Sequence, residues 1–305
     1  MTPESTALSI ESVRRRTVDF ISLTKPRVVS MILITTWVGF YLGSHGATDY
    51  LLLLPTLIGT ALAAGGTLTL NQYMERDVDA LMERTRYRPL PEGRLQPNEA
   101  LAFGVFTTAA GLIYLATAVN PLSAGVAATI TVTYLLLYTP LKRRTPFCSI
   151  VGAVPGALPP VIGWAAVRDG FGVEAGILFA ILFLWQLPHS LAIGQLYRDD
   201  YARAGFRLLP VVEPDAQSTA RQVVNNCLAL VAVGLLPSVV GLAGPLYFVA
   251  AMILGLGFLG YGIHFSRHRT EAAARQLLFA SLIYLPAILI AMALDKAPGL
   301  GSLLG

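Results

Sequence analysis

Long apolar runs alternate with short polar breaks along nearly the whole chain. A helix needs roughly 20 residues to cross a hydrocarbon core about 30 Å thick. Nine runs predict membrane-spanning helices at 28–43, 50–70, 98–118, 122–140, 147–167, 174–196, 222–242, 245–264 and 276–294. The first run is short, so a start near Ile21 is also considered, with Lys25 and Arg27 reaching toward the lipid headgroups.

The pattern predicts an all-α integral membrane protein with nine transmembrane helices in a bundle. Residues 21–295 are expected to form this bundle, residues 1–20 a mobile cytoplasmic tail, and residues 296–305 a short C-terminal tail. Prolines inside membrane helices free backbone groups that protein or enclosed water must satisfy. The prolines within the predicted spans are Pro155, Pro159, Pro160, Pro188, Pro237 and Pro286. They favour kinked helices around a central cavity, with kinks that serve packing alone as the alternative.

The basic residues predict the orientation of the bundle. Of the 22 lysine and arginine residues, 20 precede the first span or follow an even-numbered one, and only Arg168 and Lys296 fall on the other side. Because basic residues gather on the cytoplasmic side, the N-terminus and the even-numbered loops are expected to be cytoplasmic. A missed span would move every later loop to the opposite side, so the asymmetry also supports the number of spans.

Composition narrows the class of protein. Hydrophobic residues make up 54% of the chain and charged residues 13%, against about a quarter in soluble domains. The net charge of +4 indicates anchoring to an anionic inner leaflet, and it gives no reason to expect nucleic acid as a partner. The first 20 residues lack the apolar stretch of a signal peptide, and Cys148 and Cys227 lack metal-ligand spacing and suit buried thiols.

Charge is concentrated in the loop after the second span, "NQYMERDVDALMERTRYRPLPEGRL" at 71–95. If the helix continues into this loop, Asn71, Glu75 and Asp79 recur every fourth residue and lie along one stripe of its surface. Asp77 points roughly 200° away from Glu75, so it suits the same site less well. An amide and two carboxylates spaced in this way suit magnesium, which substrate phosphates usually complete.

Arginines in the same loop suit the anion that such a metal would hold. Arg76, Arg84, Arg86 and Arg88 offer bidentate partners for phosphate oxygens. Magnesium and arginines beside a cavity within the lipid indicate an amphiphilic diphosphate as the substrate. A solvated salt-bridge network at the membrane surface is the alternative.

The loop resembles the first signature of the UbiA-type intramembrane prenyltransferase superfamily, N-x-x-x-D-x-x-x-D followed by R-T-x-x-R-P-L. Four further segments look like landmarks of its heme branch: "LTKPRV" at 23–28, "KRRTPFCSIVGAVPGALPPVIGWAA" at 142–166, "WQLPHS" at 185–190 and "YRDDYARAGFRLLPVV" at 197–212. The resemblance covers nearly the whole chain. It implies that Asn71, Glu75 and Asp79 are the catalytic residues and hold Mg²⁺ on the diphosphate, although Glu75 stands where aspartate is commoner.

The second charged loop departs further from the superfamily pattern. Tyr197 and Tyr201 occupy the two positions at which other branches carry metal-binding aspartates. Either Asp199 and Asp200 take over part of the metal role, with Asp200 the added candidate ligand, or Arg198 and the two tyrosines bind diphosphate or a porphyrin propionate directly. Lys142, in a basic cluster with Arg143 and Arg144, is a further candidate for diphosphate, although marking the membrane interface also explains that cluster.

Candidate contacts to a heme substrate lie deeper in the bundle. His189 falls inside the sixth predicted span, where ionisable residues are functional hypotheses by default. Iron ligation, porphyrin orientation and a structural hydrogen bond are all open for it. Trp164 and Tyr201 are the other candidates, with packing as the alternative for Trp164. His45, His264 and His268 suit solvated loops.

The resemblance implies transfer of a farnesyl group from farnesyl diphosphate to a vinyl group of protoheme IX, giving heme O and diphosphate. The expected setting is the inner membrane of a bacterial- or archaeal-type cell, with the active site on the cytoplasmic side. A downstream heme-modifying enzyme and oxidase assembly proteins are candidate protein partners, besides membrane lipid. Prenylation of a quinone precursor or another tetrapyrrole is the first alternative. A polytopic transporter is the second alternative. The sequence shows no clear inverted repeat, and its polar cluster lies at one membrane interface instead of the midplane, and both features argue against a transporter.

Overall fold

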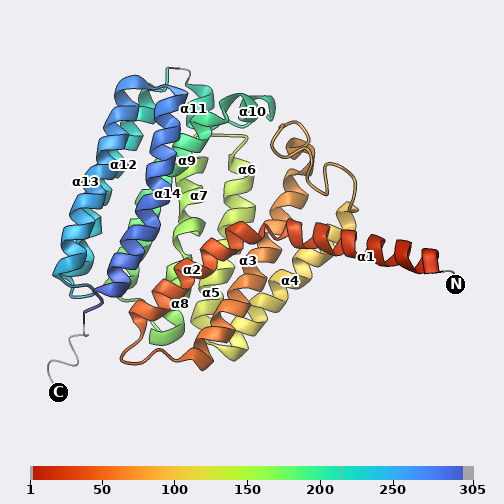
Figure 1. The fold of residues 1–305 in the computed structure, drawn as a ribbon, viewed down its shortest axis with the longest axis horizontal. Helices are drawn as coiled ribbons and strands as arrows, with labels where there is room; N and C mark the ends of the chain where they lie inside the picture. Colours follow the sequence, from red (N-terminus) through yellow and green to blue (C-terminus); the bar gives the residue numbers. More distant parts are fainter. Residues whose placement is uncertain (1–2, 214, 298–305) are drawn as a thin grey trace.

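The computed structural model describes residues 3–213 and 215–297, with side chains from Val13 onward. Within these residues nine helices are long and apolar enough to cross a membrane, which confirms the predicted number of spans. They are α2 (Pro26–Gly43), α3 (Tyr50–Asp79), α4 (Pro97–Ala118), the span Pro121–Leu141, the span Cys148–Arg168, α9 (Val173–Leu196), α12 (Gln217–Val239), α13 (Pro245–His268) and α14 (Glu271–Leu294). Figure 1 shows them as one bundle.

Two of the spans are interrupted within the bundle. The span Pro121–Leu141 consists of α5 (Pro121–Val132), a π-helical segment η1 (Thr133–Tyr138) and the short α6 (Thr139–Leu141). The span Cys148–Arg168 is divided at Leu158 into α7 (Cys148–Ala157) and α8 (Pro159–Arg168). Proline explains the second break because Pro159 lacks the N–H that would continue the hydrogen-bond ladder. π-helical segments often occur at functional sites, and η1 lies beside the candidate site described below.

Close contacts between small residues join neighbouring helices. A Cβ at Gly163 of α8 would lie 1.9 Å from the carbonyl oxygen of Thr36, and one at Gly39 of α2 would lie 1.9 Å from the carbonyl oxygen of Pro160. The backbones of α2 and α8 therefore touch, in the manner of membrane helices that pack through small residues. The largest buried cluster is centred on α9, α12, α13 and α14 and includes Tyr247, Phe265 and Tyr284.

The residues expected to form an N-terminal tail are helical from Pro3. Helix α1 (Pro3–Leu23) projects sideways from the bundle in Figure 1. Its last residue, Leu23, is fully buried against Leu90 and Leu95, and Asp19 is paired with Arg94 at 3.1 Å. The chain then breaks at Lys25, whose φ of 50° is left-handed, before α2 begins.

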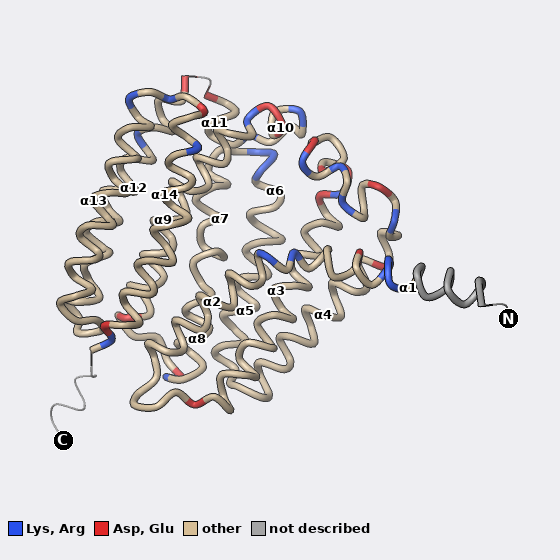
Figure 2. Tube along the Cα trace, in the orientation of Figure 1, with Lys and Arg blue, Asp and Glu red and all other residues tan. Residues whose placement is uncertain are grey.

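Charge is distributed unevenly between the two ends of the bundle, and Figure 2 shows lysine and arginine gathered at the end that holds α10 (Arg198–Arg203), α11 (Leu209–Val212) and the loop after α3. At the opposite end, Arg168 donates to the carbonyl oxygen of Gly43 at 2.6 Å. Lys296 donates to the carbonyl oxygens of Tyr41 and Ser44 at 2.6 and 2.7 Å. Both cations thus cap the C-terminal end of α2, where helix carbonyls lack partners. The expected C-terminal tail lies outside the described residues from 298 on.

Candidate active site

The predicted stripe of oxygen donors lies on the last two turns of α3. Asn71, Glu75 and Asp79 are 1%, 8% and 2% exposed, whereas the Asp77 side chain is 83% exposed. The helical register expected from their spacing is therefore present. The stripe faces the interior of the protein.

Each oxygen ligand of the stripe contacts a cation, two of them from distant segments and one from the loop that follows α3. Lys25 donates to Asn71 Oδ1 at 3.3 Å, Lys142 donates to both carboxylate oxygens of Glu75 at 2.9 and 3.1 Å, and Arg88 donates to Asp79 at 2.7 Å. The interpretation in which Lys25 reaches toward lipid headgroups is wrong, because the break before α2 turns its side chain inward. The three cations can bind an anionic group through charge-assisted hydrogen bonds.

The two lysines differ in their surroundings. Burial, together with the positive charges of Arg88 and Lys142, lowers the pKa of Lys25 to about 7. Burial alone would lower the pKa of Lys142, but the nearby Tyr138 and Glu75 oxygens raise this pKa above its ordinary value. Lys142 is therefore held as a cation against Glu75.

Thr139 determines whether the amide nitrogen or the amide oxygen of Asn71 is available to a cation. The Thr139 hydroxyl donates to the carbonyl oxygen of Tyr134 at 2.9 Å, so its single proton is committed within the span of η1 and α6. The hydroxyl oxygen must then accept from Asn71 Nδ2, 3.1 Å away, while Nδ2 also donates to Glu75 at 3.1 Å. With both amide protons used, the oxygen of Asn71 is left for a cation.

The donor chemistry of the stripe fits magnesium. No group of three or more His, Cys, Asp or Glu side chains in the described parts of the chain could hold a metal ion by itself. Two carboxylates and one amide oxygen are hard ligands, and magnesium commonly takes few protein ligands and completes its shell with water and substrate phosphates. Asn71, Glu75 and Asp79 are the residues that would hold it.

Other predicted diphosphate contacts fall into two groups. Arg84 stacks on Tyr197 and Tyr201, with its carbon Cζ 5.1 and 5.8 Å from the two ring centroids, and it donates to the Tyr201 hydroxyl at 3.2 Å. Arg84, Tyr197, Arg198 and Asp200 line a second, polar pocket, which contains none of the stripe residues. Arg76 instead donates to the carbonyl oxygen of Tyr73 and contacts Asp77, so the structure does not bring it to the stripe.

Asp200 accepts hydrogen bonds from the backbone N–H of Glu83 and from Arg203. These contacts link α10 to the loop after α3. Asp200 thus lies between the two charged loops that the sequence places far apart, while none of its contacts is with the stripe.

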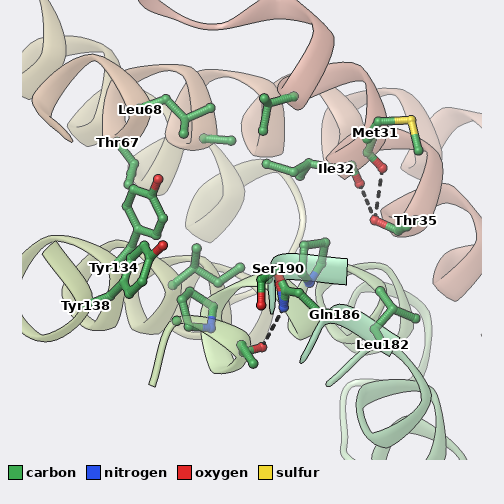
Figure 3. A pocket seen from close by; sticks show the side chains of 18 of the residues that line it. Met31, Ile32, Thr35, Thr67, Leu68, Tyr134, Tyr138, Leu182, Gln186 and Ser190 are labelled. Carbon is green, nitrogen blue, oxygen red and sulfur yellow. Dashed lines mark hydrogen bonds between the residues drawn. The ribbon is translucent and has the colours of Figure 1, made fainter. Parts of the chain in front are cut away.

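An apolar cavity of about 540 Å³ lies inside the bundle. It is lined mainly by residues of α2, α3, η1, α7 and α9, and Figure 3 shows Tyr134 and Tyr138 together on the side opposite Met31 and Thr35. The Tyr138 ring also lies 4.5 Å from the Lys142 ammonium, so one residue borders both the cavity and the stripe. The expected central cavity is present, and it adjoins the charged site.

Of the candidate heme contacts, His189 and Tyr201 line the cavity and Trp164 does not. Trp164 is 3% exposed and packs between Gly43 and Arg168 at the opposite end of the bundle, so its predicted contact with a heme in this cavity is wrong. Trp185 takes the aromatic position in the cavity wall. The structure adds five residues that the sequence analysis did not single out as site residues. Lys25 and Trp185 lie inside quoted segments, whereas Tyr134, Tyr138 and Thr139 precede the one that begins at residue 142.

The chain belongs to the UbiA prenyltransferase family, whose model matches residues 32–283. Its relatives include proteins named protoheme IX farnesyltransferase from several bacteria. That of Solibacter usitatus is 50% identical over 92% of this chain and 99% of the relative, and that of Myxococcus xanthus is 45% identical over 92% and 95%.

Solved structures share the fold. A structure of a digeranylgeranylglyceryl phosphate synthase matches with a TM-score of 0.79 at 17% identity, covering 93% of this chain and 98% of the other. A UbiA homolog from Archaeoglobus fulgidus bound to GPP and Mg²⁺ matches with a TM-score of 0.62 at 15% identity, covering 90% and 99%.

Proposed function

We propose that this protein transfers a farnesyl group from farnesyl diphosphate to a vinyl group of protoheme IX, giving heme O and diphosphate. The observation that carries the reaction class is the stripe of Asn71, Glu75 and Asp79, with its three cations, at the edge of an apolar cavity. The acceptor follows from relatives named protoheme IX farnesyltransferase, such as those of Solibacter usitatus and Myxococcus xanthus, which match over nearly their full lengths.

The charges of the stripe suit a magnesium diphosphate. With Lys25, Arg88 and Lys142 protonated, the cations outnumber the carboxylates Glu75 and Asp79 by one. A bound Mg²⁺ would add two positive charges, and an ionised diphosphate ester carries about three negative charges. The loaded site would then be close to neutral, which favours burial of the substrate's charged end.

The chain's own residues account for most of the reaction. Arg88, Lys142 and Lys25 are placed to stabilise negative charge on the departing diphosphate as the bond to the farnesyl carbon breaks. The cavity wall, which includes Met31, Leu182 and other apolar groups, keeps water from the allylic cation until the vinyl carbon attacks it. Magnesium, when bound, supplies further positive charge to the leaving group. One water must then enter to provide the hydroxyl group of the product and release a proton.

Mass spectrometry of the tetrapyrrole product tests this function. Purified protein is incubated with protoheme, farnesyl diphosphate and magnesium, and the expected product is protoheme that has gained one farnesyl and one hydroxyl group. Parallel reactions replace protoheme with a quinone precursor or replace magnesium with a chelator. Product from the quinone precursor but not from protoheme would contradict the proposed acceptor, and full turnover in chelator would contradict the proposed metal.

A further inference from the structure

Two aromatic rings on α9 are held by one serine on α14. The ring of His189 stacks on Trp185 with 4.9 Å between centroids, and its Nδ1 lies 2.8 Å from Ser281 Oγ. Trp185 Nε1 donates to the backbone oxygen of Ser281, also at 2.8 Å. Ser281 is fully buried, so its contacts fix one face and one edge of the imidazole.

The hydrogen bonds of Ser281 determine the tautomer of His189. The serine hydroxyl lies 2.6 Å from the carbonyl oxygen of Leu278, which can only accept, so its single proton is used there. The same oxygen must accept a hydrogen from His189 Nδ1. A neutral imidazole carries one N–H, and Nε2 is therefore left with a free lone pair.

This lone pair opens into the cavity. Nε2 has no hydrogen-bond partner among the described residues, yet it is not one of their fully buried unpaired polar atoms, and His189 lines the cavity wall. The polar contact of His189 is a side-chain hydroxyl, so this residue does not satisfy a backbone group freed by Pro188. The hydrogen bond to Ser281 uses only one ring nitrogen, so it leaves Nε2 available to a ligand in the cavity.

We propose that His189 Nε2 is an axial ligand for the iron of a porphyrin bound in the cavity, and that Ser281 is the positioning residue that keeps Nε2 unprotonated. Imidazole nitrogen is a good ligand for iron, and metal-binding histidines commonly donate their other ring N–H to a fixed acceptor. The identity of the porphyrin rests on the proposed function, whereas the tautomer rests on the geometry alone.

Two porphyrins that differ only in iron test the proposal in the full-length protein without farnesyl diphosphate. Ferric protoheme and metal-free protoporphyrin IX are titrated separately into the wild type and into His189→Ala. We expect the variant to lose affinity for protoheme while keeping that for protoporphyrin IX, which also shows that it is folded. Added imidazole should restore the histidine-ligand absorption and paramagnetic resonance signals. Equal losses for both porphyrins, or no loss, would overturn iron ligation.

Ser281→Ala tests the positioning role, with Ser190→Ala as the matched control. Ser190 also lines the cavity, but its hydroxyl bonds to the carbonyl oxygen of Leu187 on its own helix. Ser281→Ala is expected to lower protoheme affinity about 10-fold and to alter the axial-ligand spectrum, whereas Ser190→Ala should do neither. An unchanged spectrum in Ser281→Ala would overturn the positioning role.

The product assay on the wild type separates this inference from the proposed function. If the wild type converts protoheme but His189→Ala shows no iron-specific loss, the ligand role alone fails. If the wild type binds protoheme through His189 but forms no farnesylated product, the ligand role stands and the proposed reaction fails.

Discussion

At the scale of single residues, burial changes what substitutions in the stripe should do. Asn71, Glu75 and Asp79 are nearly inaccessible, and each contacts a cation that would lose its partner. Removing a stripe residue should therefore lower stability as well as turnover.

Glu75→Ala is expected to abolish turnover and to destabilise the fold by about 3–5 kcal/mol, because it leaves the Lys142 ammonium buried without a carboxylate. Glu75→Asp should retain much more activity, since a carboxylate remains. In the double variant Glu75→Ala with Lys142→Met, stability should recover while activity stays absent. Thermal melts and the product assay are compared across the set, and a double variant no more stable than Glu75→Ala would contradict the pairing.

Thr139→Val should weaken magnesium-dependent binding of farnesyl diphosphate about 10-fold, because Asn71 loses the acceptor that orients its amide. Thr139→Ser keeps that acceptor and should bind as the wild type does. Thr131→Val is the control, since Thr131 lines the same cavity and bonds to Thr67 and Ala127. Calorimetry without an acceptor measures each affinity, and similar values for Thr139→Val and Thr131→Val would count against the orienting role.

At the scale of helices, the apolar pattern predicted the number and the approximate bounds of the spans, and it predicted little of their internal irregularity. Most spans begin and end within about five residues of the prediction, since the hydrocarbon core sets their length. The π-helical turn of η1 was not predicted, because its sequence "TYLLLY" is as apolar as its neighbours. The division at Leu158 was partly indicated by Pro159 and Pro160.

Gly163→Ala should destabilise the protein by about 1–3 kcal/mol, because the added methyl group would meet the backbone of α2. Gly257→Ala in α13 is the matched control, since a Cβ there has no neighbour within 4 Å. Thermal unfolding in detergent should separate the two variants clearly. Equal melting temperatures would show that α2 and α8 accommodate the added methyl group without a loss of stability.

At the scale of the whole molecule, the site combines residues from separate segments, and the spacing of these residues along the sequence does not show which of them are in contact. The stripe was predictable because its three members share one helix. Of its partners, Arg88 and Lys142 were expected at the site, whereas Lys25 and Thr139 were not. The four residues reach the stripe from three segments of the chain, and only the packed bundle sets their distances. The same limit explains why Trp164 was assigned to the cavity and Trp185 was not.

Orientation in the membrane is a prediction of the charge asymmetry, which Figure 2 displays. Reporter fusions at residues 85, 143, 205 and 268 should be cytoplasmic, and fusions at 46, 120, 169 and 300 should lie outside, because basic loops stay on the cytoplasmic side. The inverse pattern would place the stripe on the outer side and would contradict a cytoplasmic active site.

The capping of α2 by Arg168 and Lys296 has a consequence for biogenesis. On the predicted topology these are the two basic residues that must be carried across the membrane, and the carbonyls that receive them belong to the first span. Lys296 follows the last span, α14. Its hydrogen bonds to α2 therefore connect the last span to the first, and they can form only when all the spans are inserted. Until then, the C-terminal carbonyl oxygens of α2 have only Arg168 as a charged donor, and the oxygens of Tyr41 and Ser44 face water on the outer side.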